Sequence, residues 1–574
     1  MIETELREVI EKAAGERVVL EHPANSEHGD YSTNIALVLA KKLNKDPREI
    51  AEDIVLRIKD KGLKILDRVE IAGPGFINFF LSQNYLMGEM GEVQKKKEKY
   101  GTSVSSKGKK VMVEFTDPNP FKEFHIGHLY SNIVGESLSR VFESQGALVK
   151  RANYQGDVGM HVAKAVWGMK KKMEADKLSL AGLAKKSLEE RVKFLGQSYA
   201  LGADAFERDE SAKKEIGELN RKIFALDKEI KELYLKGRKW SLDYFEKIYK
   251  RLGTKFNYYY FESKVGKVGL ETVKEGLKKG IFEESQGAVI FPGEKYGLHS
   301  RVFINSQGLP TYEAKELGLA PTKYKDFKYD TSVIVTGNEI IGYFKVLIQA
   351  LKLLSPEIGN KTFHVSHGMV RLPEGKMSSR TGKILAGDEL IDQVQGKVLE
   401  RMKTSGSEVP QKEWEKAAEK IALAAIKYSL LRVTPGKDII FDIDTSLSLE
   451  GDSGPYLQYT YARAKSILRK AKLSDTKFPK LRETKFEKEE MDVLRYIYRF
   501  PEVAAEAARL FSPNIVAQFA VELAQKYNVF YNVLPVLQAE TKETKQFRLA
   551  LTSSVAQLLQ NSLHLLGIET LERM

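Results

Sequence analysis

The fold of this 574-residue chain is decided by residues 111–128, which read VMVEFTDPNPFKEFHIGH. The first residues form a short apolar run that Pro118 and Pro120 bring to an end, a pattern typical of a β-strand. Apolar residues then recur at helical spacing over 127–143, and a second strand is predicted over 148–154. The order strand, loop, helix, strand is typical of the opening of a parallel, doubly wound sheet.

The full length predicts a multidomain α/β protein, because a single hydrophobic core stops growing well below this size. We expect a Rossmann-type parallel-sheet catalytic domain over 108–400 with helical insertions, the main one being the charged, helix-patterned stretch at about 170–285. Later strand signals are expected to complete the second half of the sheet; they are GAVIF (287–291), RVFIN (301–305), TSVIVTG (331–337) and TFHVSHG (362–368).

Two further domains are predicted on either side of the catalytic domain. Residues 1–100 combine one long helical pattern with short β-like runs, which indicates a small α+β N-terminal domain. The basic, Gly- and Ser-containing stretch 95–110 is then expected to be a linker. From about residue 385 the pattern is almost entirely helical, so we predict an all-α helical bundle over 410–574.

The composition excludes some classes of site and favours one class of partner. There is no cysteine, which excludes disulfides, thiolate zinc sites and a cysteine nucleophile. The formal net charge of +13 favours an acidic partner such as nucleic acid, although a lysine-rich solvated surface explains it as well. No apolar stretch approaches the roughly 18 residues of a membrane span, and the start MIETELREVI is not a secretory signal. We therefore expect a cytoplasmic protein with no membrane partner.

Four of the nine histidines form two H-x-x-H pairs, His125/His128 and His364/His367. Two imidazole pairs that met across the sheet would suit a transition metal, but neither pair has the acidic neighbour of an H-E-x-x-H motif. A phosphate site explains more, because the loop after the first strand delivers its ligand to a helix N-terminus, where Gly127 leaves room for a nucleotide. A purely structural pair is the third interpretation. We expect the phosphate site and predict no metal ligands.

A second candidate phosphate-binding element follows the last predicted strand. Residues 368–383 read GMVRLPEGKMSSRTGK, with lysines, serines and an arginine set among glycines. Such a loop is expected to be mobile and to close over a triphosphate, where it would neutralise the charge of a pyrophosphate leaving group. Alone it is weak evidence, but paired with the first loop on the same sheet it becomes strong.

The motifs HIGH (125–128) and KMSSR (376–380) resemble the two ATP-binding motifs of class I aminoacyl-tRNA synthetases. Other segments, which occur in order over nearly the whole chain, resemble the arginyl-tRNA synthetase family. These segments are GDYSTNIA (29–36), GFINFFL (75–81), VEFTDPNPFKEFHIGHLYSN (113–132), NYQGDVG (153–159), LEGDSGPYLQYTYARAKSILRK (449–470) and NSLHLLGIETLERM (561–574).

The resemblance implies an ATP-dependent ligase that attaches arginine to tRNA(Arg) through an arginyl-adenylate. ATP, bound with Mg²⁺, would be a substrate, and neither step would need a protein nucleophile, since catalysis is positioning and electrostatic stabilisation. The catalytic residues implied are Lys122, His125, His128 and Lys376. The ATP-binding residues implied are His125, Gly127, His128, Met377, Ser378 and Ser379.

The second motif departs from the general KMSKS pattern, because Ser379 and Arg380 stand where a lysine and a serine would be. Many arginine enzymes lack that lysine and carry another just before the HIGH motif. Lys122 occupies that place, three residues before His125. We therefore predict that Lys122 supplies the missing positive charge; the alternative is an ordinary surface lysine.

The substrate arginine carries a planar cation, so its pocket should offer carboxylates in forked geometry. The family positions are matched by Glu114 on the first strand, Asn119 in the following turn, and Tyr312. The family aspartate four residues after that tyrosine is here Glu316, whose extra methylene requires a rearranged pocket. Residues 337–344 also depart from the family pattern, and compensation is expected from Asn338 or Glu339.

The helical C-terminal domain is implied to bind the anticodon stem and loop, and the N-terminal domain to meet the tRNA elbow. Aromatic side chains would stack on unpaired bases, although packing in a helix core is an equally good interpretation of Phe530 and Tyr531. We further expect a monomer that needs bound tRNA before it activates arginine. The tRNA-contacting residues implied are Phe76, Asn78, Tyr456, Gln458, Tyr461, Arg463, Phe530 and Tyr531.

Three other functions compete with this hypothesis. A small adenylyltransferase with the same ATP motifs would not need the helical half of the chain. A non-catalytic RNA-binding paralogue would be expected to lose the HIGH histidines or Lys376, and all are present. A metalloenzyme that used the two H-x-x-H pairs would bind stoichiometric zinc.

Overall fold

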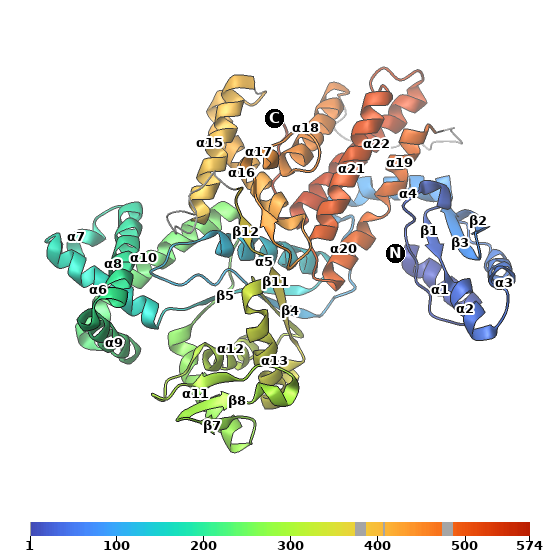
Figure 1. Ribbon diagram of the computed structural model, residues 1–574. Coiled ribbons are helices and arrows are strands. Elements are labelled where there is room, and N and C mark those ends of the chain that lie inside the picture. Colours follow the sequence, from blue (N-terminus) through green and yellow to red (C-terminus); the bar gives the residue numbers. More distant parts are fainter. Residues whose placement is uncertain (1, 374–385, 406–407, 473–485) are drawn as a thin grey trace.

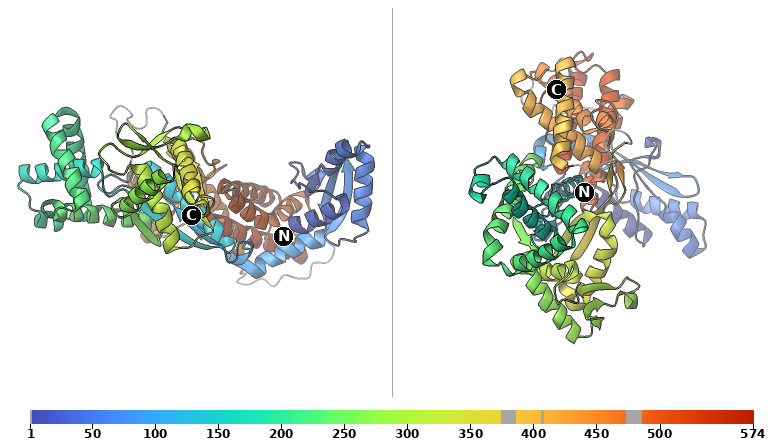
Figure 2. Two further views of the ribbon diagram at one scale, coloured as in Figure 1. Left: turned by 90° about the horizontal axis from the view of Figure 1, so that it is seen from below. Right: turned by 60° about the vertical axis from the view of Figure 1, so that its left-hand side comes forward.

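The chain is elongated in the computed structural model, which describes residues 2–373, 386–405, 408–472 and 486–574 (Figures 1 and 2). The N-terminal domain lies at one end of the long axis, and a helical unit of residues 160–252 lies at the other. A parallel sheet and the C-terminal helices lie between them. The candidate site must therefore be sought at the centre of the molecule, where the sheet meets the helices.

The central sheet has five parallel strands in the order β11-β10-β4-β5-β6. Its strands are β4 (Lys110–Glu114), β5 (Leu148–Gln155), β6 (Tyr258–Phe261), β10 (Thr331–Gly337) and β11 (Thr362–His367). Strand β4 pairs with β5 on one side and with β10 on the other, so the strand order reverses beside it. In open parallel sheets, ligands bind outside the carboxyl ends of the strands at this point.

Both faces of the sheet are covered, which explains the continuous apolar run of the first strand. Val111 and Val113 pack with α5 (Ile126–Ser144) on one face, whereas Met112 joins the core of the opposite face. That opposite core is built on α11 (Glu262–Lys278), α12 (Tyr312–Asp326) and α13 (Ile341–Leu354), with the short α14 (Pro356–Gly359) at its edge. Successive side chains of a β-strand point to opposite faces of the sheet, so the side chains of this strand enter two different hydrophobic cores.

The helical unit beside the sheet is shorter than the insertion that the sequence predicts at about 170–285. Its helices are α6 (Met160–Ala175), α7 (Leu180–Ala184), α8 (Leu188–Arg208), α9 (Glu210–Ala225) and α10 (Lys228–Leu252), packed around a separate hydrophobic core. The predicted range includes β6, which pairs in parallel with β5 as the edge strand of the main sheet. A four-residue aromatic strand in a lysine-rich stretch has too little periodicity to be recognised from sequence.

Two of the strands expected in the main sheet belong to a different one. β7 (Glu283–Ser285), β8 (Ala288–Phe291) and β9 (Arg301–Ile304) form a separate antiparallel sheet next to α12. Only the signals at 331–337 and 362–368 become strands of the parallel sheet, where they are β10 and β11. A sequence pattern that predicts a strand does not indicate which other strand it pairs with, so the two sheets could not be distinguished from the sequence.

The N-terminal domain is an antiparallel sheet of order β1-β3-β2 covered by helices. Its elements are α1 (Ile2–Ala14), β1 (Tyr31–Thr33), α2 (Ile35–Leu43), α3 (Pro47–Lys59), β2 (Leu66–Ala72) and β3 (Phe76–Leu81), followed by α4 (Gln83–Lys96). The expected linker at 95–110 is packed rather than free, since Tyr100 is buried and Asn561 donates hydrogen bonds to the carbonyls of Lys97 and Tyr100. The stretch connects the N-terminal domain to the central sheet, and these contacts fix its path at Lys97 and Tyr100.

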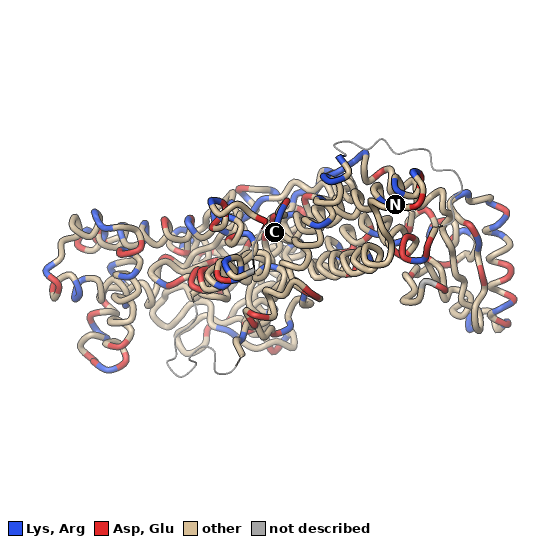
Figure 3. Tube along the Cα trace, turned by 90° about the horizontal axis from the view of Figure 1, so that it is seen from above, with Lys and Arg blue, Asp and Glu red and all other residues tan. Residues whose placement is uncertain are grey.

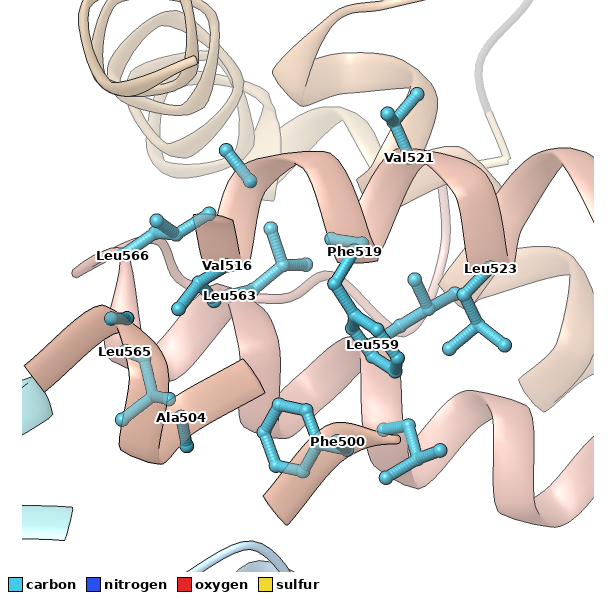
Figure 4. Packing of buried hydrophobic residues seen from close by; sticks show 14 of the residues in the cluster. Phe500, Ala504, Val516, Phe519, Val521, Leu523, Leu559, Leu563, Leu565 and Leu566 are labelled. Carbon is cyan, nitrogen blue, oxygen red and sulfur yellow. The ribbon is translucent and has the colours of Figure 1, made fainter. Parts of the chain in front are cut away.

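The C-terminal part is helical, as expected, and one short strand within it, β13 (Ile439–Ile440), pairs in parallel with β12 (Val370–Arg371), which precedes it. Its helices are α15 (Gly387–Ser405), α16 (Trp414–Leu431), α17 (Ile443–Ser446), α18 (Gly454–Lys470), α19 (Lys488–Ile497), α20 (Phe500–Arg509), α21 (Asn514–Val533) and α22 (Lys542–Leu565). Phe500, Phe519 and Leu559 meet in the interior of this bundle (Figure 4). Their core is continuous with the α5 face of the sheet, which joins the two domains.

Charged residues of both signs are interleaved along the outer helices at both ends of the molecule (Figure 3). Many of them are exposed pairs, such as Lys222 with Glu229 in the helical unit. Such pairs stabilise a fold little, so most of the charge in this part of the chain is a solvated surface. Among the described residues, no helix is long and apolar enough to cross a membrane.

Candidate active site

The histidine pair of the HIGH motif caps the N-terminus of α5. His125 is the residue before the helix, and its Nδ1 accepts a hydrogen bond of 3.1 Å from the Gly127 N–H. The Nδ1 of His128 in turn accepts one of 3.2 Å from the His125 N–H, and the two rings stack with their centroids 3.6 Å apart. This is a reciprocal capping box made of two imidazoles. Because both Nδ1 atoms accept, the proton of each neutral ring resides on Nε2, where it can be donated to a ligand.

Burial keeps both imidazoles neutral. It lowers the pKa of His125 below its usual range and, more strongly, the pKa of His128. The nearby Lys122 ammonium lowers both further. The cap leaves the phosphate interpretation open, since the backbone occupies one side of each ring and the Nε2 side stays a donor at a helix N-terminus.

Lys122 lies between the HIGH loop and the helical unit. Burial and the neighbouring Lys164 ammonium lower the pKa of Lys122, and its Nζ is 5.6 Å from the centroid of the Tyr199 ring. Lys122 is thus not an ordinary surface lysine. It is a partly desolvated cation placed close enough to His125 and His128 to act on their titration.

The second histidine pair, His364 and His367, lies on β11 and contacts neighbouring parts of the catalytic domain. The Nε2 of His364 hydrogen-bonds to the Thr336 hydroxyl at 2.7 Å, and its ring stacks on Phe344. His367 lies nearer to the HIGH motif, with its ring 4.4 Å from that of Tyr130. In the part of the chain that the structure describes, no three His, Asp or Glu side chains are grouped as a metal site requires. The two pairs therefore do not combine into a four-nitrogen ligand set.

Carboxylates gather at the carboxyl ends of β4 and β5. Glu114, the last residue of β4, forms an ion pair of 2.6 Å with Lys323, and both side chains are almost fully buried. Glu316 lies on α12 seven residues before Lys323, on the same helical face, and burial with the nearby Glu114 raises its pKa well above the usual range. Tyr312, at the first turn of this helix, is exposed and lies beside the Lys315 ammonium. The region is an acidic pocket suited to a cation.

The remaining residues predicted for arginine lie at different places around this pocket. Asn119 packs against Gly156 at the end of β5, where a Cβ at 156 would lie only 2.2 Å from its Oδ1. Asn338 points away, since its Nδ2 donates at 3.2 Å to the Gly436 carbonyl. Glu339 acts electrostatically on His125 and His367, so it belongs to the histidine side of the site. Lys376, Met377, Ser378 and Ser379 lie outside the described residues.

Most residues predicted to contact tRNA are buried. Phe530 is 0% exposed and packs near Tyr527 in the bundle core, which agrees with the interpretation of this residue as helix-core packing. Asn78 is equally enclosed, because its Oδ1 accepts a bond from the Ser32 hydroxyl across the sheet. Gln458 is 0% exposed and holds the C-terminal tail through the Glu569 carbonyl.

Of the other predicted tRNA contacts, Tyr456 and Tyr461 are also buried, and their hydroxyls are engaged by neighbouring helices and the C-terminal tail. The exposed members are Phe76 on β3 and Tyr531 on α21, whose ring lies 5.2 Å from the Arg463 guanidinium. Arg463 also donates to Asn528 and Tyr459, which orients it beside that ring. Helical periodicity alone could not tell Phe530 from Tyr531, because adjacent helical residues differ in direction by only about 100°.

Comparisons with known proteins agree over the whole length. The family description "tRNA synthetases class I (R), catalytic domain" matches residues 89–443, "DALR anticodon binding domain" matches 457–574, and "Arginyl tRNA synthetase N terminal domain" matches 1–81. The arginine–tRNA ligase of Treponema denticola is 33% identical, over 99% of this chain and 96% of that protein. That of Clostridium acetobutylicum is 30% identical, over 97% and 96%.

The chain belongs to the arginyl-tRNA synthetase family. It is a class I aminoacyl-tRNA synthetase, as the motifs of the sequence predict. Solved structures share its fold: the arginyl-tRNA synthetase of Thermus thermophilus has a TM-score of 0.81 at 24% identity, and that of Plasmodium falciparum 0.80 at 22%. The match covers 100% of this chain in both cases, and 100% and 99% of the two structures. The non-catalytic and metalloenzyme hypotheses receive no support from these relatives.

Three residues that lie close to the predicted arginine-binding residues were not predicted from the sequence. Lys323 follows Glu316 by two helical turns, a spacing visible in the sequence, but its partner Glu114 is 209 residues away. Asp117 is an acidic residue three positions after the first strand, a place typical of ligand-binding side chains in parallel sheets. Tyr154 lies within the segment NYQGDVG, yet nothing in that segment shows that its hydroxyl is buried.

Proposed function

We propose that this synthetase attaches arginine to tRNA(Arg) in two steps, through an arginyl-adenylate. The observation that carries the proposal is the junction of the acidic pocket with the neutral histidine pair at one edge of the sheet. A single loop, residues 115–124, joins Glu114 of the pocket to His125 of the cap. A substrate that places its cationic groups among the carboxylates would present its own carboxylate toward the helix N-terminus, where ATP phosphates are favoured.

In the first step, the carboxylate of arginine attacks the α-phosphorus of MgATP, and pyrophosphate leaves. The Nε2–H groups of His125 and His128 are positioned to donate to phosphate oxygens as negative charge moves onto them. Lys122 adds a cation beside them, and Gly127 lets the nucleotide approach the backbone. Lys376, Met377, Ser378 and Ser379 are proposed to close on the phosphates from the other side, on the basis of the sequence motif alone. No protein nucleophile is required.

Recognition of arginine is proposed to rest on Glu114, Asn119, Tyr312 and Glu316, with Asn338 and Glu339 at the margin of the pocket. A neutral analogue such as citrulline would leave a desolvated carboxylate without its cation, and we expect it to be rejected strongly. The direct test is aminoacylation of tRNA(Arg) by the full chain with each amino acid in turn. Charging with arginine only is the expected result, and no charging with arginine would refute the proposal.

Replacement of His125 by asparagine separates its two proposed roles. The asparagine Oδ1 can still accept the Gly127 N–H, so the thermal midpoint should stay near that of the wild type. The Nε2–H donor is lost, and arginine activation should fall about 10–100-fold, the worth of one hydrogen bond to a charged group. The measurement is arginine-dependent pyrophosphate exchange in the presence of tRNA. Normal exchange in a normally folded variant would show that His125 acts only as a cap.

Arginine activation is proposed to require bound tRNA. Pyrophosphate exchange should be at background without tRNA(Arg) and appear when it is added. A matched control is the same tRNA with its terminal adenosine oxidised, which can bind but cannot be charged. Appreciable exchange by the protein alone would contradict this proposal. The surfaces proposed to hold tRNA are those that remain exposed, around Phe76 on β3 and around Arg463 and Tyr531 on the C-terminal helices.

The protein is proposed to act as a monomer in the cytoplasm, where its tRNA substrate is used. The oligomeric state is testable by light scattering at micromolar concentration, with and without tRNA.

A further inference from the structure

The loop that leaves β4 has an uncommon backbone. Thr116 and Asp117 have φ values of 80° and 44°, in the left-handed region that side chains other than glycine rarely adopt. Each such residue costs about 1–3 kcal/mol unless the surroundings enforce it, and such strain gathers at functional sites. Here the conformation turns the Asp117 carboxylate inward, where its Oδ1 accepts a 2.7 Å hydrogen bond from the Tyr154 N–H at the end of β5.

Asp117 thereby becomes the third carboxylate of the acidic pocket. Burial is the main cause that raises the pKa of Asp117 well above its usual range, and the nearby Glu114 is the second. The pKa of Glu316 is raised by burial and by both of these acids. The described ammonium groups at the cluster are those of Lys323 and Lys315, which are already paired with Glu114 and with the neighbouring Glu262. The desolvated space thus contains more carboxylates than cations.

A second observation, independent of the acids, points to a ligand in the same space. The Tyr154 hydroxyl is buried in a side chain that is only 7% exposed, and it has no hydrogen-bond partner among the described residues. Burial raises the pKa of Tyr154 most, and Glu262, Glu316 and Glu114 raise it further, so these carboxylates lie near the hydroxyl. Buried polar groups are nearly always hydrogen-bonded, and an orphaned hydroxyl beside an acidic pocket indicates a polar ligand there.

We propose that Asp117 is a further specificity-determining residue of the arginine pocket, and that it shares with Glu316 a proton that is released when arginine binds. The inference rests on the proposed function of this site. In the empty pocket, one carboxyl O–H persists because closely spaced, desolvated carboxylates cannot all ionise. When the cationic groups of arginine enter, that O–H bond breaks, the proton passes to solvent, and the carboxylate pairs with the substrate.

The direction in which the affinity for arginine changes with pH follows from the release of this proton. Since the complex carries fewer protons than the separate partners, the affinity for arginine should rise with pH until the cluster is ionised without ligand. Titratable and charged groups from several elements face Asp117 and share in this equilibrium. Those that act on Asp117 are Glu114 on β4, Tyr154 on β5, Tyr249 on α10, and Glu316 and Lys323 on α12; Glu262 on α11 and Tyr343 on α13 interact with Glu316.

Proton release is measured by calorimetric titration of the full chain with L-arginine near neutral pH, in two buffers of different ionisation enthalpy. The wild type should release a measurable fraction of a proton, up to about one per arginine bound. Asp117→Asn keeps an oxygen for the Tyr154 N–H but removes the charge. It should lower the release and weaken arginine binding about 10–100-fold, while citrulline binding stays as weak as before.

Asp30→Asn is a matched control. Asp30 is a buried aspartate in the N-terminal domain that also accepts a backbone N–H, from Leu81 at 2.8 Å, and burial raises its pKa as well. This variant should bind arginine with wild-type affinity and wild-type proton release. A merely structural role of Asp117 would predict that both variants behave alike.

The inference is overturned if wild-type binding releases no proton, or if folded Asp117→Asn retains both the release and the affinity. In either case, aminoacylation by the wild type would leave the proposed function standing. If Asp117→Asn fails to fold, the buffer dependence of the wild type and of Glu316→Gln decides the question. Absence of both arginine binding and tRNA charging in the wild type would remove the proposed function itself.

Discussion

Replacement of Lys122 by alanine should lower the rate of arginyl-adenylate formation about 100–1000-fold, the usual loss for one preorganised group that stabilises transition-state charge. The second motif lacks the second lysine of the KMSKS pattern, so a cation must come from elsewhere. The structure places the Lys122 ammonium beside both HIGH imidazoles, in a partly desolvated position where its field is weakly screened. Single-turnover formation of the adenylate in the presence of tRNA measures the effect.

Two variants separate charge from general disturbance of the loop. Lys122→Arg keeps the positive charge and should recover a large part of the rate. Lys164→Ala removes the cation next to Lys122, but Lys164 itself is held over the Phe206 ring at 3.9 Å, and we expect a change of no more than about 3-fold. A near-normal rate in Lys122→Ala would show that the missing lysine is not replaced from this position.

Replacement of Lys323 by methionine should reduce the free energy of unfolding of the catalytic domain by about 3–5 kcal/mol, because it leaves the Glu114 carboxylate buried without its partner. The ion pair is 2.6 Å long and its side chains are 2% and 1% exposed. Asp117 and Glu316 would lose the same cation, which adds to the effect. The measurement is urea-induced unfolding, in which a spectroscopic probe of the central sheet reports the midpoint concentration.

The double variant Lys323→Met/Glu114→Gln tests the reason for this loss. Removing both charges abolishes the unpaired carboxylate, and most of the stability should return, since apolar or neutral replacements of a buried pair are often tolerated. Lys420→Met is the control, because its partner Glu569 is 72% exposed and stays hydrated without the lysine, so this pair should be worth less than about 1 kcal/mol. Equal losses in the buried and exposed cases would refute the argument.

Local features of the fold could be predicted because they depend on neighbours in sequence. The strand that ends in Glu114, the turn with its prolines and the helix that begins after His125 lie within one short stretch. The hypothesis that His125 and His128 contact phosphate followed from that local order. What could not be predicted was that the same rings cap the helix, because an imidazole cap is rarer than a Ser, Thr or Asp cap.

Contacts between segments that are far apart in the sequence could not be predicted in the same way. The strands at 288–291 and 301–304 carry the same signal as those of the main sheet but lie in another one. Phe530 and Tyr531 are adjacent aromatic residues, and only one of them reaches the surface. Each outcome depends on which element covers which face, and a single sequence does not contain that information.

The sequence by itself determined the enzyme family, the fold class and the local order of strand, loop and helix that carries the HIGH motif, because each is expressed in contiguous motifs. Only the tertiary structure decided the charge balance of the arginine pocket. That balance joins Glu114 to Lys323 across 209 residues and turns Asp117 inward through a strained loop. Electrostatic energies depend on distance and desolvation in space, which the order of residues along the chain does not specify.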